Sequence, residues 1–256
     1  MVISGEVLIK MDSFQAVTDV LKDSSRNSFM IKRMEDLADR TVWAMGEQLK
    51  CGDFVPFVFE HKFNMEVGDG DRKQLMSGTI DRVDICENGT DVYVRIIDYK
   101  TGKKDFNIVK TYYGIDIQLM VYMEAAMKLV AKMRPGKNVI PAGVFYYNIS
   151  DPIVSATTES AEEIEDKIKG ELRLKGMVNS DKDIAEKMDN TEGTSLNIPV
   201  SRKADGGFDS RRSKVMNTEQ FNILGRFVDV RAIDTADRIA GGAVSYTHLR
   251  AHETLS

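Results

Sequence analysis

Apolar and polar residues alternate along two neighbouring stretches of the chain, residues 75–86 and 91–100, and this period predicts two β-strands. The dipeptide Asn88-Gly89 separates the stretches. Asn-Gly between two alternating runs favours a tight hairpin turn. The pattern therefore predicts an antiparallel hairpin with its turn centred on these two residues.

Helical periods and further apolar runs surround the hairpin, and a loop rich in Gly, Ser, Asn and Asp is expected over 189–214. The sequence predicts helices over 12–22, 28–50, 113–132, 160–175 and 217–240, and strands over 56–66 and 141–149. Strands flanked by helices predict an α/β or α+β sandwich.

Two acids and a lysine stand at one end of the hairpin. Asp98 and Lys100 follow the apolar run 92–97, on the face that holds its even-numbered residues. A turn centred as above pairs Asp81 with Ile96, diagonal to Asp98 at a Cα separation of roughly 7–8 Å. The register thus predicts that the two carboxylates lie near each other, beside Lys100.

This combination suits metal-dependent cleavage of a phosphodiester. Carboxylate oxygens bind hard cations, a bound cation activates water, and a lysine can orient that water or offset charge on the phosphate. The alternative is an ordinary hairpin with exposed charges. Asp98 continues an apolar face, however, and a buried carboxylate needs compensation. A cation would supply that compensation, and so would Lys100 or Arg82 alone.

Other motifs accompany these residues in a fixed order. They are Gly78–Asp84, Ile96–Gly102 and Gln118–Tyr122, with flanking stretches at 41–45, 48–50, 52–54, 140–147 and 198–201. Over roughly residues 30–243 the set resembles the RecB-type branch of the PD-(D/E)XK nucleases. The flanks resemble, more narrowly, the C-terminal nuclease domains of AddB subunits from bacterial AddAB helicase–nucleases.

The resemblance implies a restriction-endonuclease-like core, a central mixed sheet flanked by helices. It implies that Asp81, Asp98 and the carbonyl of Tyr99 bind Mg²⁺ and that Lys100 assists the attacking water. Gln118 and Tyr122 match the family's Gln-x-x-x-Tyr motif, and their spacing puts them on one helical face. That face would orient Lys100 or contact DNA. From the residues alone, the alternative is that Gln118 is a polar residue on the helix surface and that Tyr122 is a half-buried aromatic without a catalytic role.

The sequence departs from the family in two respects. The family's histidine ligand comes from an upstream helix, whereas His61 lies in a predicted strand. The family's iron–sulfur cluster needs four cysteines, and Cys51 and Cys86 are the only two here, so no cluster is supported.

The last residues, 244–256, resemble translated sequencing-adapter sequence. We therefore expect a nuclease domain over 1–243, truncated at both ends, followed by a non-native tail.

The overall charge of −5 does not indicate a nucleic-acid binder, but the charge is unevenly distributed. Residues 95–137 hold nine Lys or Arg and four Asp or Glu, a local charge of +5. A phosphate backbone requires such local charge, although a solvated surface is the alternative. The candidate DNA contacts are Arg82, Arg95, Lys103, Lys104 and Lys110. The sequence has no apolar run long enough to span a bilayer and no secretory pattern, which predicts a cytoplasmic protein.

We therefore expect a Mg²⁺-dependent DNA exonuclease domain of a helicase–nuclease that processes double-strand breaks for recombinational repair. The family implies 5′→3′ degradation, and the partners that it implies are DNA and an AddA-type helicase–nuclease subunit. The alternatives are a catalytically inactive, partner-binding module and a free-standing or phage RecB-like exonuclease. The intact acids and lysine favour the enzyme, whereas the missing histidine helix and cluster cysteines favour an inactive fragment.

Overall fold

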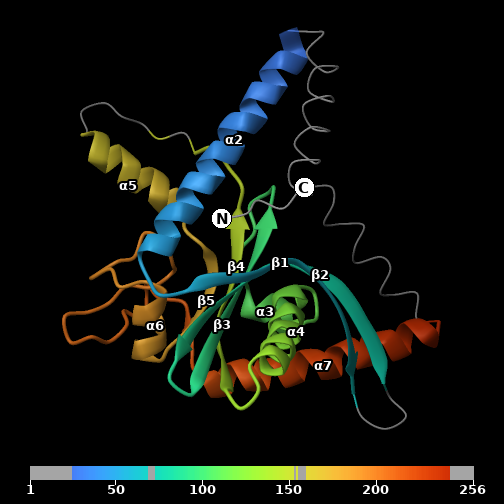
Figure 1. Ribbon diagram of the computed structural model, residues 1–256. Coiled ribbons are helices and arrows are strands. Elements are labelled where there is room, and N and C mark those ends of the chain that lie inside the picture. The colour runs from blue at the N-terminus through green and yellow to red at the C-terminus, as the bar shows by residue number, and fades with distance from the viewer. Residues whose placement is uncertain (1–24, 69–72, 153, 155–159, 243–256) are drawn as a thin grey trace.

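The computed structural model describes residues 25–68, 73–152, 154 and 160–242, and it is an α/β fold around one mixed six-stranded sheet (Figure 1). The strands lie side by side in chain order; β3 pairs with β4 and β5 with β6 in parallel, and the other neighbours are antiparallel. The strands are β1 (Val55–Val67), β2 (Gln74–Asn88), β3 (Asp91–Lys100), β4 (Asn138–Asn148), β5 (Lys175–Asn179) and β6 (Val215–Met216). The helices are α2 (Ser25–Lys50), α3 (Ile108–Tyr112), α4 (Gln118–Met133), α5 (Ala161–Glu171), α6 (Lys182–Met188) and α7 (Thr218–Ala240). The predicted fold class is confirmed.

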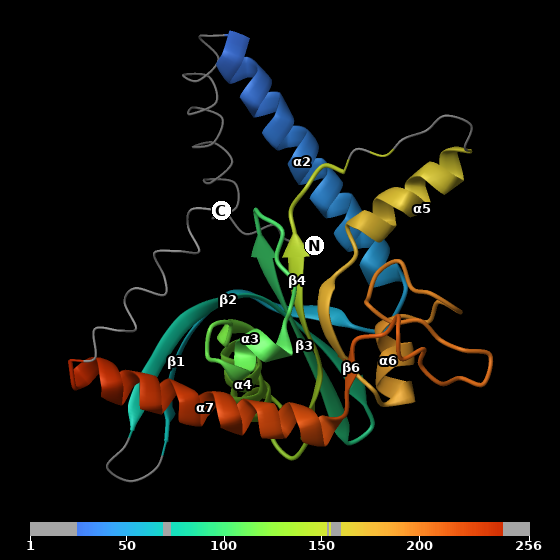
Figure 2. The ribbon, with the colours of Figure 1, turned by 180° about the vertical axis from the view of Figure 1, so that it is seen from behind.

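Helices cover the two faces of the sheet and create two apolar cores. On one face α4 lies against β3 and β4, and α7 packs against α4 and crosses it in the view of Figure 2. The even-numbered residues Val92, Val94 and Ile96 of β3 pack into this core. The odd-numbered Tyr93 and Ile97 face the other core, which α2 and α6 help to form. The predicted alternation along β3 is therefore confirmed.

Several predicted elements have different limits in the structure. The helix expected over 113–132 begins at Gln118, because Gly114 adopts a φ of +75° and the chain turns after the short helix α3. The helix expected over 160–175 ends at Glu171, and Lys175 already belongs to β5. The sequence did not predict α6, β5 or β6, and the helix expected over 12–22 lies outside the described residues. No helix in the described ranges combines the length and apolar character needed to cross a membrane.

The predicted hairpin register is wrong by two residues. The last pair before the turn is Asn88 with Asp91, so the loop consists of Gly89 and Thr90. Gly89 has a φ of +59°, which suits glycine at the first position of a two-residue hairpin loop. A shift of two keeps every side chain on its predicted face. The ladder ends at Arg82 with Ile97, and its next step places Asp81 opposite Asp98 rather than opposite Ile96.

Candidate active site

Asp98 is a buried acid on the α4 side of the sheet, with 2% of its surface exposed. Its Oδ2 lies 2.5 Å from Nζ of Lys100, although no described group gives that oxygen a hydrogen bond of normal geometry. Burial raises the pKa of Asp98; Lys100 opposes the shift, and the charges of Asp81 and Asp116 add to it. Asp98 is thus a carboxylate whose compensating charge comes from one partly exposed lysine.

Asp81 reaches the same end of β3 from the neighbouring strand. Its Oδ2 accepts a hydrogen bond of 2.7 Å from the backbone N–H of Tyr99. That amide belongs to the peptide bond joining Asp98 to Tyr99, so the Asp81 carboxylate lies directly beside the backbone of Asp98. The Asp81 side chain accepts this hydrogen bond at the point where backbone pairing between β2 and β3 ends.

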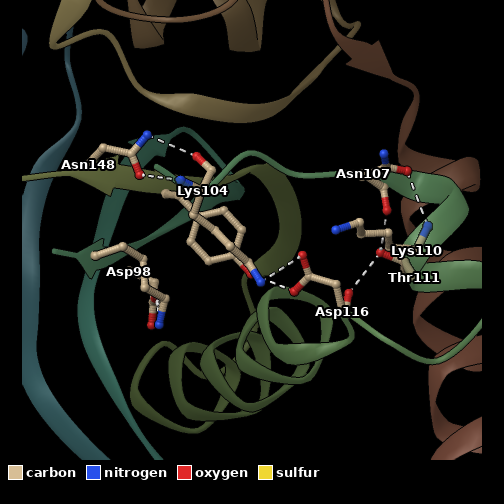
Figure 3. Close-up of polar contacts among 9 residues, drawn as sticks. Asp98, Lys104, Asn107, Lys110, Thr111, Asp116 and Asn148 are labelled. Carbon is tan, nitrogen blue, oxygen red and sulfur yellow. Dashed lines mark hydrogen bonds and ion pairs between the residues drawn. The ribbon is translucent and has the colours of Figure 1, made fainter. Parts of the chain in front are cut away.

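A third acid, Asp116, belongs to the same polar cluster and was not predicted from the sequence. It is 5% exposed; its Oδ1 accepts a hydrogen bond of 2.8 Å from the Tyr146 hydroxyl, and its Oδ2 lies 3.3 Å from Nζ of Lys104. Figure 3 shows the Asp116 carboxylate directed at Lys104, with Asp98 on the other side of that lysine. The Nζ atoms of Lys100 and Lys104 lie 5.8 and 5.5 Å from the centre of the Tyr146 ring.

Hydrogen bonds fix the loop that carries Lys104 and Asp116. Asn148 at the end of β4 accepts a 3.0 Å hydrogen bond from the Lys104 N–H and donates one of 2.9 Å to its carbonyl. Asn107 caps α3, and the Thr111 hydroxyl lies 3.1 and 2.9 Å from the backbone oxygens of Asn107 and Asp116, to either of which it can donate (Figure 3). These hydrogen bonds tie the loop between β3 and α4 to the end of β4 and to α3.

Gln118 and Tyr122 lie on one face of α4, as their spacing predicts. The Gln118 side-chain amide donates a 2.9 Å hydrogen bond to the Tyr122 hydroxyl. The Tyr122 ring also packs edge-on against Phe63 of β1, with a centroid distance of 5.8 Å. Their proposed function in orienting Lys100 or contacting DNA stays a prediction.

Two of the residues predicted to bind DNA are buried in the structure. Arg82 and Arg95 both pair with Asp84 at 2.6–2.9 Å, and all three side chains are at most 2% exposed. The guanidinium groups lie on the face opposite Asp98, which argues against the predicted DNA contacts. Lys103 and Lys110 are exposed, and Lys104 is half-buried.

The two acids fit a divalent cation only if other ligands complete its coordination. Among the described residues, no group of three His, Cys, Asp or Glu side chains is placed to hold a metal ion. His61 lies in β1 opposite Ile80, and both cysteines are free thiols. Mg²⁺ is commonly held by one or two carboxylates together with water and substrate phosphate oxygens. Asp81 and the under-compensated Asp98 match that donor set.

The fold and this site define a nuclease domain, and the chain belongs to the PD-(D/E)XK nuclease superfamily, whose family profile matches residues 6–245. More particularly, the chain is similar to the B subunit of the ATP-dependent helicase/deoxyribonucleases. It is 35% identical over 237 residues to that protein from Clostridium botulinum (strain Hall), covering 88% of this chain and 20% of the relative. It is 34% identical over 242 residues to the corresponding protein from Thermoanaerobacter sp. (strain X514), covering 90% and 21%. The chain thus spans about a fifth of the length of these relatives.

Proposed function

We propose that this chain is the nuclease domain of a helicase–nuclease B subunit and that it hydrolyses DNA phosphodiesters with Mg²⁺. The proposal includes the finer assignments that the resemblance of the sequence motifs implies: 5′→3′ exonuclease action, processing of double-strand breaks for recombinational repair in the cytoplasm, and association with an AddA-type subunit.

The buried Asp98–Lys100 pair beside Asp81 carries this proposal. A buried carboxylate with a raised pKa costs folding free energy, and perturbed acids of this kind concentrate at functional sites. The pair also reaches the protein surface, because the Lys100 side chain is 30% exposed. A purely structural ion pair would not need a second acid next to the same peptide bond.

Each residue of the cluster has a role in this proposal. Asp81, Asp98 and the carbonyl of Tyr99 would hold the metal ion, which when bound polarises the phosphate and lowers the pKa of a water ligand. The Lys100 ammonium orients the attacking water and offsets charge that develops on the phosphate. Gln118 and Tyr122 lie on α4 beside this end of the sheet and would contact the DNA strand or orient Lys100.

Asp116 and Tyr146 contact the lysines of the site. Asp116 pairs with the ammonium of Lys104, and the Tyr146 ring lies within 6 Å of the Nζ atoms of Lys100 and Lys104. Burial and the hydrogen bond to Asp116 raise the pKa of Tyr146, so its hydroxyl stays a proton donor to that carboxylate. The two lysines are thereby kept on one side of Asp98.

One observation favours a second candidate, a nuclease-like module without catalytic activity. Within the part of the chain that the structure describes, no group of three His, Cys, Asp or Glu side chains could hold a metal ion, so Asp81 and Asp98 have no third side-chain ligand. Such a module would associate with the helicase partner without cleaving DNA.

Cleavage of end-labelled DNA tests the proposal. The chain, in excess over single- and double-stranded DNA labelled at either end, is incubated with Mg²⁺ or with EDTA. We expect Mg²⁺-dependent cleavage, with products that identify the strand polarity, and loss of cleavage in Asp98→Asn. Asp91→Asn is the matched control: it changes the same charge at the start of β3, seven residues and about 23 Å away. Cleavage by Asp98→Asn at the wild-type rate would exclude the assigned site, and no cleavage by the wild type would favour the inactive module.

A further inference from the structure

A groove whose charged residues are mostly basic lies beside the candidate active site. It has a volume of about 560 Å³ and is formed by the loop after β3, the end of β4, the segment from the end of α5 to the start of β5, Pro199, and Lys214 just before β6. Its charged lining consists of five cations and two acids: Lys103, Lys104, Arg173, Lys175, Lys214, Asp105 and Glu171. We call this surface the basic groove.

The strand register connects the basic groove to the acids. Asp98 of β3 pairs with Tyr146 of β4, and Tyr146 pairs with Lys175 of β5. Residues paired across neighbouring strands point to the same face of a sheet. Asp98, Tyr146 and Lys175 therefore form a row on the α4 face, and two strand spacings separate its ends by about 10 Å.

Lys104 belongs to both the site and the groove. Its Nζ lies 3.3 Å from Asp116, within the polar cluster, while the residue also lines the basic groove. The groove therefore adjoins the polar cluster at Lys104.

The cations of the basic groove are only partly compensated. Lys214 pairs with Asp105 at 2.5 Å, but the buried Nε of Arg173 donates no hydrogen bond to any described group. Lys175 is half-buried; burial lowers its pKa, the charges of Arg173 and Lys214 lower it further, and those of Glu171 and Asp105 oppose the shift. Like charges held together in a chain of net charge −5 favour an anionic ligand.

We propose that the basic groove binds backbone phosphates of the DNA strand next to the cleaved phosphodiester. This proposal rests on the proposed function, because cleavage at Asp98 would set the position of the DNA strand relative to the groove. A nucleic-acid backbone fits better than an acidic protein segment, because the groove shares Lys104 with the candidate phosphodiester site and five of its seven charged residues are cations.

The test is DNA binding without cleavage. Anisotropy of a fluorescein-labelled single-stranded oligonucleotide is measured in EDTA at several salt concentrations, with Lys175→Gln, Arg173→Gln and Lys103→Gln. Lys132→Gln is the matched control, since it removes one exposed charge at the far end of α4. Each groove variant should bind several-fold more weakly, equally for all sequences, and the slope of log K against log salt should fall by about 0.7 per lost contact.

The outcomes separate this proposal from the proposed function. Groove variants that bind like Lys132→Gln, while the wild type binds and cleaves, overturn the groove and leave the nuclease assignment standing. A wild type that neither binds nor cleaves DNA overturns both. Lys103 lies on an exposed loop, so its variant tests the groove even if substitution of half-buried Lys175 lowers the melting temperature. In cleavage assays, the groove variants should raise KM and leave kcat near the wild-type value.

Discussion

Asp84→Asn should strongly destabilise the chain, because Asp84 is the shared partner of two buried arginines. Arg82 donates to both carboxylate oxygens, at 2.6 and 2.8 Å, and Arg95 donates to Oδ2 at 2.9 Å. Asp84 has 0% of its surface exposed, and the guanidinium of Arg95 also lies 4.9 Å from the centre of the Phe54 ring. Asparagine keeps the shape of the side chain but leaves two buried positive charges without a counter-charge.

The magnitude follows from the burial of the group. Removing one partner of a buried ion pair costs about 3–5 kcal/mol. Asparagine still accepts one hydrogen bond, so we expect the lower end, about 3 kcal/mol. For a chain of this length, each kcal/mol lowers the melting temperature by roughly 2–4 °C, so the melting temperature should fall by roughly 6–12 °C. The buried triad of Arg82, Asp84 and Arg95 also connects β2 to β3, so the rate of DNA cleavage should decline together with stability.

Urea unfolding and thermal melting of Asp84→Asn measure this effect. Asp91→Asn, with the same change of charge on β3, should stay within about 0.5 kcal/mol of the wild type, as substitutions away from buried networks usually do. A loss below about 1 kcal/mol in Asp84→Asn would show that the two arginines do not depend on this carboxylate, and the buried triad would have to be reinterpreted.

Two further predictions concern the other unusual acids. Asp116→Asn keeps an acceptor for the Tyr146 hydroxyl but removes the charge beside Lys104, so DNA cleavage should slow several-fold; an unchanged single-turnover rate would contradict this role. Burial and the neighbouring Glu124 raise the pKa of Asp229 to about 7. A carboxyl with a raised pKa in the folded state makes folding more favourable as the pH falls from about 7 toward its ordinary value. As the pH is lowered through this range, the melting temperature should therefore rise less steeply in Asp229→Asn than in the wild type. Identical slopes would refute the raised pKa of Asp229.

The sequence pattern identified the hairpin and the apolar face that carries Asp98, because alternation and the turn dipeptide are local signals. The register was wrong because Gly89 can occupy either central position of a two-residue turn, and the structure puts it first. The error was harmless for the site, since a shift of two preserves the faces of Asp81 and Asp98.

The missed features depend on contacts between distant segments. Asp116 gains its role from Tyr146, thirty residues later, and from the turn at Gly114, which separates it from α3. An acid two residues before Gln118, between two isoleucines, was the available signal. Similarly, Arg95 reads as a basic residue near the site, and only the fold shows that β3 is buried on both faces and that Asp84 neutralises it.

Binding of Mn²⁺, used as a substitute for Mg²⁺ and followed by electron paramagnetic resonance, tests the central claim most directly. The wild-type chain should bind the ion at a site that needs both acids. Asp81→Asn and Asp98→Asn should each weaken binding by at least about tenfold, because even substitutions of residues that only support a metal ligand cost about that much affinity. Asp91→Asn should bind like the wild type. Equal Mn²⁺ affinity in the wild type and Asp98→Asn would contradict the claim that these acids form the metal-binding centre of a nuclease.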